Sequence, residues 1–327
     1  MIEVTVPDYF EEFRCTADKC PDNCCIGWEI DIDDKTYRKY MSFTCALKSE
    51  MDEYITVSED GSRCFRLTKE LRCPFLNEQN LCRIILSEGE DALCDICANH
   101  PRFHNCFGNI RRTGAGISCI AAAELLLKKR DTTKFVTYMS DEPPADIDYD
   151  ESFLEFVIAF EQRIIEILQD RSERLCVRIK NALTLAEKAQ YKIDGYTEND
   201  TADNDYSPLL SRLIPLNDEW QNAVQNAAIK QYNDETALEQ LAVYYIYRHL
   251  SSAVYDGDVL GRVKLAVFCV MASVMVCGGD IIRSSCLVSK EIEYCSENID
   301  IILDAAYSDD YMTICSLEKA VEKICGI

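Results

Sequence analysis

Histidine and positive charge are both scarce in this chain. Three histidines occur among 327 residues, so a histidine-rich metal site is excluded. Lysine and arginine together number 34 against 57 aspartates and glutamates, which gives a formal net charge of −23. Nucleic-acid binding requires a basic face, and none is visible, so we expect no nucleic-acid partner. Positively charged partners, such as proteins with surface lysines, are attracted instead.

Long apolar runs are also missing. The longest, Leu265–Cys277, is shorter than the roughly 20 residues that a membrane-spanning helix needs, and it predicts a buried core helix. Residues 1–10 show no basic segment followed by an apolar one, so we expect no signal peptide. Together these observations predict a cytoplasmic protein without a membrane partner.

Cysteine, by contrast, is abundant. The chain has 19 cysteines, and 12 of them lie at or before Cys119. A secreted disulfide scaffold is normally short, whereas this chain is long and its cysteine count is odd. Clustered cysteines in a reducing cytosol indicate metal binding or catalysis. The alternative is that they are buried free thiols, and we favour that interpretation for the seven cysteines beyond Cys119.

The chain divides into three parts by composition. Residues 1–130 are predicted to form an irregular, cysteine-rich metal-binding domain. Residues 131–152 are expected to be an acidic linker, because they contain two prolines and many carboxylates. Residues 153–327 show apolar side chains at spacings of three and four and predict an all-helical domain. Its expected helices include 153–168, 175–191, 219–231, 236–254, 260–277, 289–307 and 311–324. The predicted fold class is therefore mainly α.

The cysteines of the first part form two groups. The first is Cys15, Cys20, Cys24 and Cys25, and the second is Cys73, Cys82, Cys94, Cys97 and Cys119. Neighbouring side chains such as those of Cys24 and Cys25 diverge, so the first group is expected to need ligands from the second. Cys94 and Cys97 are three residues apart, which places both thiols on one face of a helical turn. The spacing does not separate zinc from an iron–sulfur cluster.

The stretches CTADKCPDNCCIGWEIDID and CPFLNEQNLCRIILSEGEDALCDICANHPR, followed by Ser118-Cys119, resemble the flagellin lysine N-methylase family. That family belongs to a wider group with a CxxCxxCC-type zinc- or iron-chelating domain. The resemblance covers about residues 10–123. It implies methyl transfer from S-adenosylmethionine to lysines of flagellin or a similar surface protein, and a [4Fe–4S] cluster with zinc as the alternative. By position it implies nine candidate ligands: Cys15, Cys20, Cys24, Cys25, Cys73, Cys82, Cys94, Cys97 and Cys119.

Nine thiols exceed the four that one such cluster takes, so some are structural or a second metal is present. The chain lacks the C-x3-C-x2-C triad of common radical enzymes and a strand–GxGxxG–helix unit. Its S-adenosylmethionine pocket and catalytic base are therefore not indicated. Arg102 is a candidate contact for the cluster or for the carboxylate of the methyl donor. The alternative is that Arg102 caps a loop or pairs with nearby acids.

Two other functions remain open from the sequence. The first is a non-enzymatic metal-binding or metal-delivery module that uses the helical part as a docking surface. The second is an adaptor that a structural zinc ion stabilises.

Overall fold

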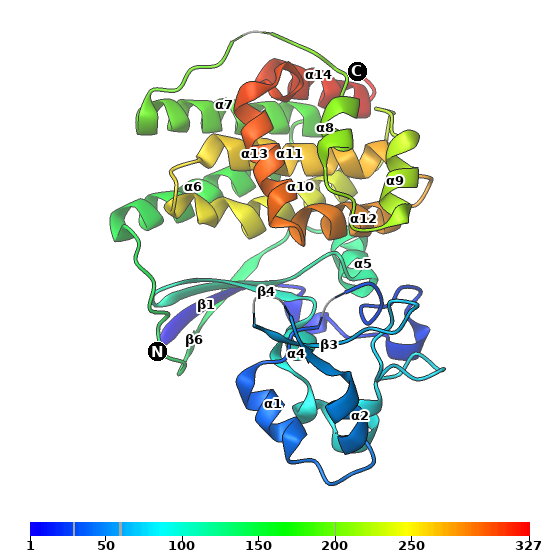
Figure 1. Cartoon of the computed structure of the whole chain (residues 1–327). Helices are drawn as coiled ribbons and strands as arrows, with labels where there is room; N and C mark the ends of the chain where they lie inside the picture. The colour runs from blue at the N-terminus through cyan, green and yellow to red at the C-terminus, as the bar shows by residue number, and fades with distance from the viewer. Residues whose placement is uncertain (29, 59–60, 200) are drawn as a thin grey trace. The chain divides into compact units, whose positions relative to one another are not determined.

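The computed structural model describes residues 1–28, 30–58, 61–199 and 201–327. The fold is mainly α-helical, as predicted (Figure 1). Two compact units are distinguished. The helical unit comprises residues 1–13, 104–118 and 122–327, and the cysteine-rich unit comprises residues 14–103 and 119–121. The N-terminal segment thus belongs to the helical unit, whose parts are far apart in the sequence.

The helical unit contains a four-stranded sheet with the order β4-β5-β1-β6. Its strands are β1 (Ile2–Pro7), β4 (Arg102–Phe107), β5 (Ile110–Ala115) and β6 (Phe135–Ser140). β1 pairs in parallel with β5, where Val4 faces Arg111, and antiparallel with β6, where Val4 faces Tyr138. This sheet was not predicted from the sequence. The stretch expected to be a linker, residues 131–152, contributes β6 to it.

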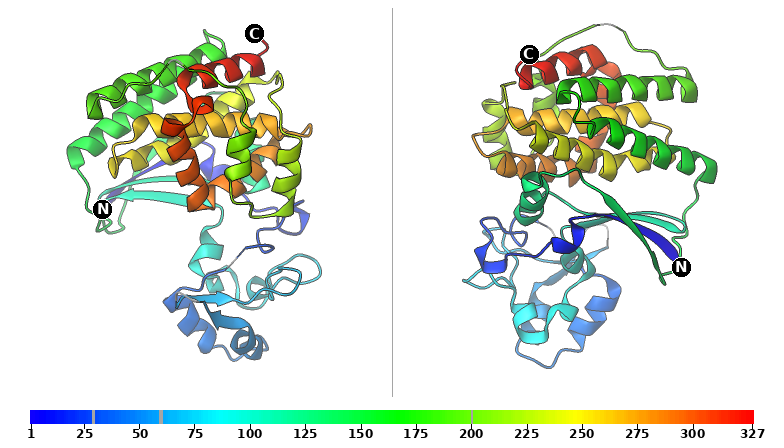
Figure 2. Two further views of the ribbon diagram at one scale, coloured as in Figure 1. Left: turned by 45° about the horizontal axis from the view of Figure 1, so that its top comes forward. Right: turned by 180° about the vertical axis from the view of Figure 1, so that it is seen from behind.

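Helices form the rest of this unit. They are α5 (Ile120–Lys128), α6 (Glu151–Leu168), α7 (Leu175–Asp194), α8 (Ser207–Arg212), α9 (Asp218–Gln225), α10 (Glu235–His249), α11 (Val259–Met275), α12 (Ile281–Glu293), α13 (Ser296–Ser308) and α14 (Ile314–Ile324). Helix α11 lies among α7, α10, α12, α13 and α14 (Figure 2), and every one of its residues is buried. The apolar run therefore forms a core helix, as predicted. No described helix is long and apolar enough to cross a membrane.

Two predicted helices differ from the observed ones. The stretch 289–307 was expected to be one helix, but α12 ends at Glu293 and α13 begins at Ser296. Cys295 between them has an extended backbone, with φ −134° and ψ 104°, which interrupts the helical path. Helix α9 ends at Gln225, well before the predicted residue 231. Apolar spacing continues across both breaks, and for that reason the pattern alone does not reveal them.

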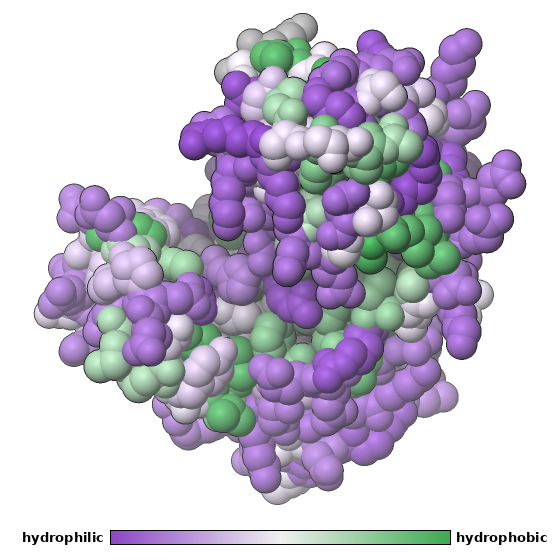
Figure 3. Space-filling view, turned by 90° about the horizontal axis from the view of Figure 1, so that it is seen from below, coloured by the Kyte–Doolittle hydropathy of each residue, from purple (hydrophilic) through white to green (hydrophobic). Residues whose placement is uncertain are grey.

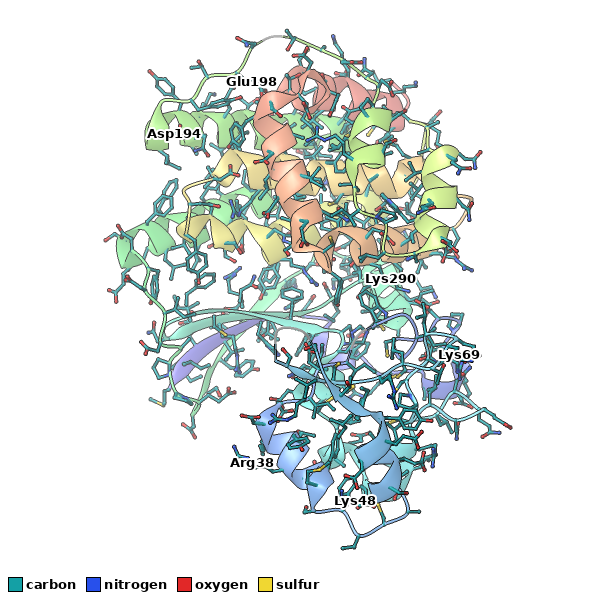
Figure 4. All side chains as sticks on the ribbon, in the orientation of Figure 1. Arg38, Lys48, Lys69, Asp194, Glu198 and Lys290 are labelled. Atoms are coloured by element: carbon teal, nitrogen blue, oxygen red, sulfur yellow. The ribbon has the colours of Figure 1, made fainter. Side chains whose placement is uncertain are left out.

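Charged side chains are also found inside the helical unit. Lys264 on α11 is fully buried and pairs with Glu198, which lies in the segment between α7 and α8 (Figure 4). Its ammonium group also donates to the Ala306 carbonyl at 2.6 Å. Glu239 on α10 accepts hydrogen bonds from Arg171 at 2.8 Å and Arg178 at 2.6 Å. Lys264 and Glu239 thus each have an opposite charge beside them, which offsets their desolvation.

The cysteine-rich unit is built from short elements. These are α1 (Asp34–Met41), α2 (Lys48–Tyr54), β2 (Ile55–Val57), β3 (Arg63–Phe65), α3 (Arg83–Glu88) and α4 (Asp95–Asn99). Strands β2 and β3 form an antiparallel pair. Single 3₁₀ turns occur along the chain at Phe10–Glu12, Ala17–Lys19, Glu90–Ala92, Leu250–Val254 and Asp310–Met312. The region predicted to be irregular thus contains short helices and strands.

Hydrophilic side chains dominate the face drawn in Figure 3, and hydrophobic ones occur there in small groups. Arg38 on α1 and Lys48 on α2 project from the cysteine-rich unit, as does Lys69 in the loop after β3 (Figure 4). Lys48 pairs with Asp52 one turn further along α2. This surface agrees with the high charged content of the sequence.

Candidate metal centre in the cysteine-rich unit

The core of the cysteine-rich unit consists of aromatic rings and cysteine thiols. Phe75 is fully buried, and its ring centroid lies 4.9 Å from that of Phe65. Cys73 and Cys94 are buried in this core, and Cys25, Cys82 and Cys97 pack against it, as does Cys45, which is not among the nine candidate ligands. A shared core thus brings together five of the nine candidate ligands, from segments up to 72 residues apart.

Backbone pairings position Cys25, Cys73 and Cys82. The Cys73 amide donates to the Cys25 carbonyl at 2.8 Å, next to an antiparallel bridge between Ile26 and Arg72. A second antiparallel bridge pairs Leu76 with Cys82. The positive φ of Gly27, 77°, allows its amide to donate to the Leu71 carbonyl at 2.8 Å. Each of the three cysteines therefore lies at or beside a backbone pairing rather than in a free loop.

Cys94 and Cys97 lie on one helical turn, as their spacing predicts. Cys94 is the residue before α4, and Cys97 lies within it. The Cys97 thiol donates a hydrogen bond to Cys94, which lowers the pKa of Cys94 and raises that of Cys97. Burial also raises the pKa of Cys73, to about 11, and the neighbouring Cys82 and Cys94 add to this rise. These thiols are close enough to influence one another's ionisation.

Tyr40, the second-last residue of α1, packs in the same core as these thiols. Its side chain is fully buried, and its hydroxyl lies near the backbone amide of Cys94. Burial raises the pKa of the Tyr40 phenol, and the thiols of Cys94 and Cys97 add to the rise, as does that of Cys82. The ring packs against Phe43 and Phe65, with centroids 5.4 and 5.8 Å away. Tyr40 is not among the site residues predicted from the sequence, because a tyrosine at helical spacing is typical of an ordinary core.

Asp33 joins the helix that carries Tyr40 to the turn that carries the two thiols. One carboxylate oxygen, Oδ1, accepts from the Thr36 amide at 2.8 Å and caps α1. The other, Oδ2, accepts from the Asp95 amide at 3.0 Å at the start of α4. Burial opposes its ionisation, but these hydrogen bonds outweigh that effect and lower the pKa of Asp33. Asp33 therefore fixes α1 relative to α4.

A cavity of about 390 Å³ opens beside Asp33. Four carboxylates line it, together with Arg63 and several neutral residues, and the four are Asp31, Asp33, Asp34 and Asp95. Arg63 pairs with Asp34 at 2.6 Å. The other three carboxylates that line the cavity form no salt bridge with Arg63; they are Asp31, Asp33 and Asp95. An acidic cavity of this kind attracts cations and repels anions.

The other predicted site residues lie elsewhere. Cys15 and Cys24 are exposed, and Cys20 and Cys119 are partly buried. The Cys15 sulfur accepts a hydrogen bond from the Ala17 amide at 3.4 Å. Arg102 is exposed at the start of β4. Cys64, which is not among the nine candidates, is buried on β3. The structure thus separates the predicted ligands into a core set and a peripheral set.

The donor set suits a thiolate-bound metal in its chemistry. Soft thiolates bind zinc and iron–sulfur clusters, and the five core cysteines are not disulfide-bonded. Within the described ranges, no three Cys, His, Asp or Glu side chains are arranged for ligating one metal ion. A bound metal would therefore require the thiols to turn toward each other from their present rotamers.

A second polar cluster lies inside the helical unit, between α10 and α12. The fully buried Glu293 carboxylate accepts from Arg248 and from the His249 ring, both at 2.8 Å. Burial raises the pKa of Glu293, but Arg248 and His249 outweigh that effect and lower it. The Tyr244 hydroxyl also donates to Glu293, at 2.9 Å. These contacts join α10 to α12, and the His249 ring contributes to them.

Three curated proteins from Salmonella are similar to this chain. The lysine-N-methylases of Salmonella choleraesuis (strain SC-B67) and Salmonella typhimurium (strain LT2) are each 31% identical to it over 135 residues. This stretch is 40% of the chain and 34% of either relative, so the chain spans about a third of the length of these two proteins.

The third relative is the flagellar biosynthetic protein FliU of Salmonella muenchen. It is also 31% identical over 135 residues, and here the match covers 80% of the relative and 40% of the chain. No protein-family profile matches the chain, and no solved structure does.

Proposed function

Because the chain belongs to the flagellin lysine N-methylase family, we propose that it transfers a methyl group from S-adenosylmethionine to lysine side chains of flagellin or a similar surface protein. The lysine-N-methylases among its relatives supply the reaction class, and FliU supplies the flagellar context. The observation that carries the proposal is this relationship together with the convergence of five cysteines in one core.

The reaction requires a neutral amine, because the lone pair of the lysine nitrogen attacks the methyl carbon. Free lysine has a pKa of about 10.4, so the site must accept a proton or desolvate the ammonium group first. The approaching lysine is cationic, and a chain of net charge −23 attracts it. The carboxylates around the Asp33 cavity add to this attraction on the cysteine-rich unit.

We further propose that four of the five core cysteines, Cys25, Cys73, Cys82, Cys94 and Cys97, hold a [4Fe–4S] cluster. When bound, such a cluster would either stabilise the unit or bind and reduce the sulfonium donor. The chain's own contribution is to place the thiols through the Cys25–Cys73 pairing and the α4 turn. In this proposal the exposed Cys15 and Cys24 are not ligands of that cluster.

The metal is tested first, with the full chain purified without oxygen. A visible absorption band that bleaches with dithionite, and four irons per chain, are expected. Cys94→Ser combined with Cys97→Ser should remove the band, whereas the control Cys315→Ser, in α14 of the helical unit, should retain it. A colourless protein with one tightly bound zinc would instead support the non-enzymatic metal-binding module.

The activity is tested with the same loaded protein, flagellin and S-adenosylmethionine that carries a labelled methyl group. The expected result is labelled methyl-lysine in flagellin peptides by mass spectrometry, and none with the double cysteine variant. Transfer to lysines of an unrelated protein at the same rate would contradict flagellin as the substrate. Absence of transfer by fully loaded protein would contradict the enzymatic proposal itself.

A further inference from the structure

Strand β6 forms one edge of the four-stranded sheet. The strand order β4-β5-β1-β6 gives it β1 as a neighbour on one side, and no other described strand pairs with its second side (Figure 1). It pairs with β1 along its whole length, from Pro7 opposite Phe135 to Ile2 opposite Ser140, and no bulge interrupts this ladder. A regular strand with an open side can pair with a further strand.

Alternate residues of β6 direct their backbone N–H and C=O groups to the open side. In an antiparallel ladder, every second residue bonds to the neighbouring strand, and the residues between them point away from it. The Asp8 amide donates to the Lys134 carbonyl at 2.8 Å, so the even-numbered residues bond toward β1. The Glu3 amide, opposite Met139, donates at 2.7 Å to a carbonyl in the turn before β5 instead. The backbone groups of Thr137 and Met139 therefore point outward, and no other described segment bonds to them.

Strand β6 lacks the features that usually protect a sheet edge. Such edges in folded proteins commonly carry a charged residue, a proline or a bulge. The opposite edge of the sheet, β4, contains Arg102 and His104, whereas the β6 sequence FVTYMS contains no charge and no proline. Three apolar side chains of β6 are instead 45–60% exposed: Val136, Tyr138 and Met139. An edge of this kind suits the addition of another extended chain.

The segment directly after β6 is acidic. Residues 141–151 contain six carboxylates. Glu142 pairs with an arginine of β5, and Asp150 caps α6. Three others are exposed and form no salt bridge within the described residues: Asp141, Asp146 and Asp148. Their charge is complementary to lysine side chains of a partner, and the net charge of −23 disfavours a second copy of this chain.

We propose that the open edge of β6 binds an extended, lysine-bearing segment of the protein substrate, which adds to the sheet as a further strand. The inference deepens the proposed function and rests on it for the identity of the partner. Main-chain hydrogen bonds supply the affinity in strand addition, and side-chain contacts supply the specificity. The outward backbone groups of Thr137 and Met139 bond the segment. Val136 and Tyr138 contact its apolar side chains, and the acidic residues after the strand attract its lysines.

Binding is measured first, with the full chain and without a methyl donor. The probe is a fluorescent peptide of alternating lysine and valine, and about nine residues are enough to cover the six of β6. The wild type is expected to bind it. A matched peptide with N-methyl groups on two consecutive central residues keeps its side chains but has both edges blocked. It should bind about tenfold more weakly, because backbone hydrogen bonds are lost.

Two outcomes of this measurement would overturn the inference. Equal affinity for the N-methylated peptide would show that no strand is added to the sheet. Equal affinity for a peptide with glutamate in place of lysine would show that the acidic segment does not select the partner. Neither measurement depends on a variant that has to fold.

Thr137→Pro tests the edge itself. It removes an outward amide, and proline is tolerated at edge positions whose N–H faces solvent. Val57→Pro is the matched control. Val57 is exposed on β2 of the cysteine-rich unit, between the residues that bond across to β3. Thr137→Pro should weaken binding of the lysine–valine peptide about tenfold, and Val57→Pro should bind like the wild type. Equal binding by the two variants would overturn the inference.

Methyl transfer separates this inference from the proposed function. In loaded protein, Thr137→Pro should raise the KM for flagellin about tenfold and leave kcat unchanged, because β6 holds the substrate and takes no part in the chemistry. An unchanged KM would overturn the inference alone. A wild type that transfers no methyl group but discriminates against the N-methylated peptide would overturn the proposed function and support strand addition.

Sedimentation of the wild type without peptide tests the other possible occupant of the edge. A monomer at the concentrations of the binding measurement is the expected result. A dimer that Thr137→Pro dissociates would show that a second copy of the chain covers β6, and it would overturn the inference.

Discussion

Replacement of Asp33 by alanine should loosen the two helices that frame the thiols. The change removes both hydrogen bonds of the carboxylate, the one that caps α1 and the one that the Asp95 amide donates. Asp34→Ala is the matched control. Asp34 is the next residue, and its carboxylate pairs only at the surface with Arg63, where its side chain is 72% exposed.

The expected loss follows from these contacts. Removal of a helix N-cap costs about 1 kcal/mol, and removal of a second hydrogen bond to a carboxylate costs a further ~1 kcal/mol. The total of about 2 kcal/mol corresponds to a roughly 30-fold rise in the opening equilibrium of this region. Loss of the Asp34 ion pair should cost less than about 1 kcal/mol, because exposed pairs contribute little.

Hydrogen exchange followed by mass spectrometry measures this opening in the full chain. Peptides that cover α1 and α4 should exchange roughly 30-fold faster in Asp33→Ala, and less than about fivefold faster in Asp34→Ala. Peptides from α11 should be unchanged in both variants, since that helix belongs to the other unit. Equal exchange rates in the two variants would refute the inference that Asp33 ties α1 to α4.

The pH dependence gives an independent check. The folded pKa of Asp33 lies below its unfolded value, so its contribution to stability is complete above the unfolded pKa of about 3.9. The contribution is lost as the pH falls through the folded pKa. The difference in urea midpoint between wild type and Asp33→Ala should therefore be constant between about pH 5 and 7 and shrink below about pH 4. A difference that grows in acid would contradict this assignment.

Two further predictions concern the helical unit. Glu293→Gln leaves the buried Arg248 without its opposite charge, so we expect the free energy of unfolding to fall by about 4 kcal/mol and Tm by about 10 °C. A fall in Tm of less than about 2 °C would show that the pair contributes little. Burial raises the pKa of Glu291 to about 7, although the Leu216 amide donates to it at 2.7 Å. Because the folded state holds this proton more tightly than the unfolded state, its stabilising contribution is lost as the pH rises from 4.5 to about 7. Urea midpoints of the wild type should show this decline, Glu291→Gln should flatten it, and identical pH profiles of the two proteins would contradict the shift.

The helical part of the fold could be predicted well from the sequence. Apolar spacing over residues 153–168 and 175–191 depends only on which side chains repeat every three or four positions, and helices α6 and α7 confirm it. The break at Cys295 and the end of α9 at Gln225 were missed. Both depend on backbone conformation at a single residue, which leaves no mark on the periodicity.

The four-stranded sheet could not be predicted from the sequence. Strand β1 pairs with β5 and β6, which lie more than 100 residues further along the chain, and none of the three is recognisable without its partners. Val4 is fully buried between two such partners, which only the fold brings beside it. Strand pairing is a non-local property, whereas the helical pattern is local.

The cysteine content, the spacing of Cys94 and Cys97 and the acidic charge were determined by the sequence alone, since each is a property of residue type or of nearest neighbours. Which of the nine cysteines share one core was decided only by the tertiary structure, as was the place of Tyr40 beside them. The physical reason is that two hydrogen bonds bring distant segments of the chain together and so set the distances between these side chains. One joins Cys73 to Cys25, and the other joins Asp95 to Asp33. Neither contact joins residues that are neighbours in the sequence.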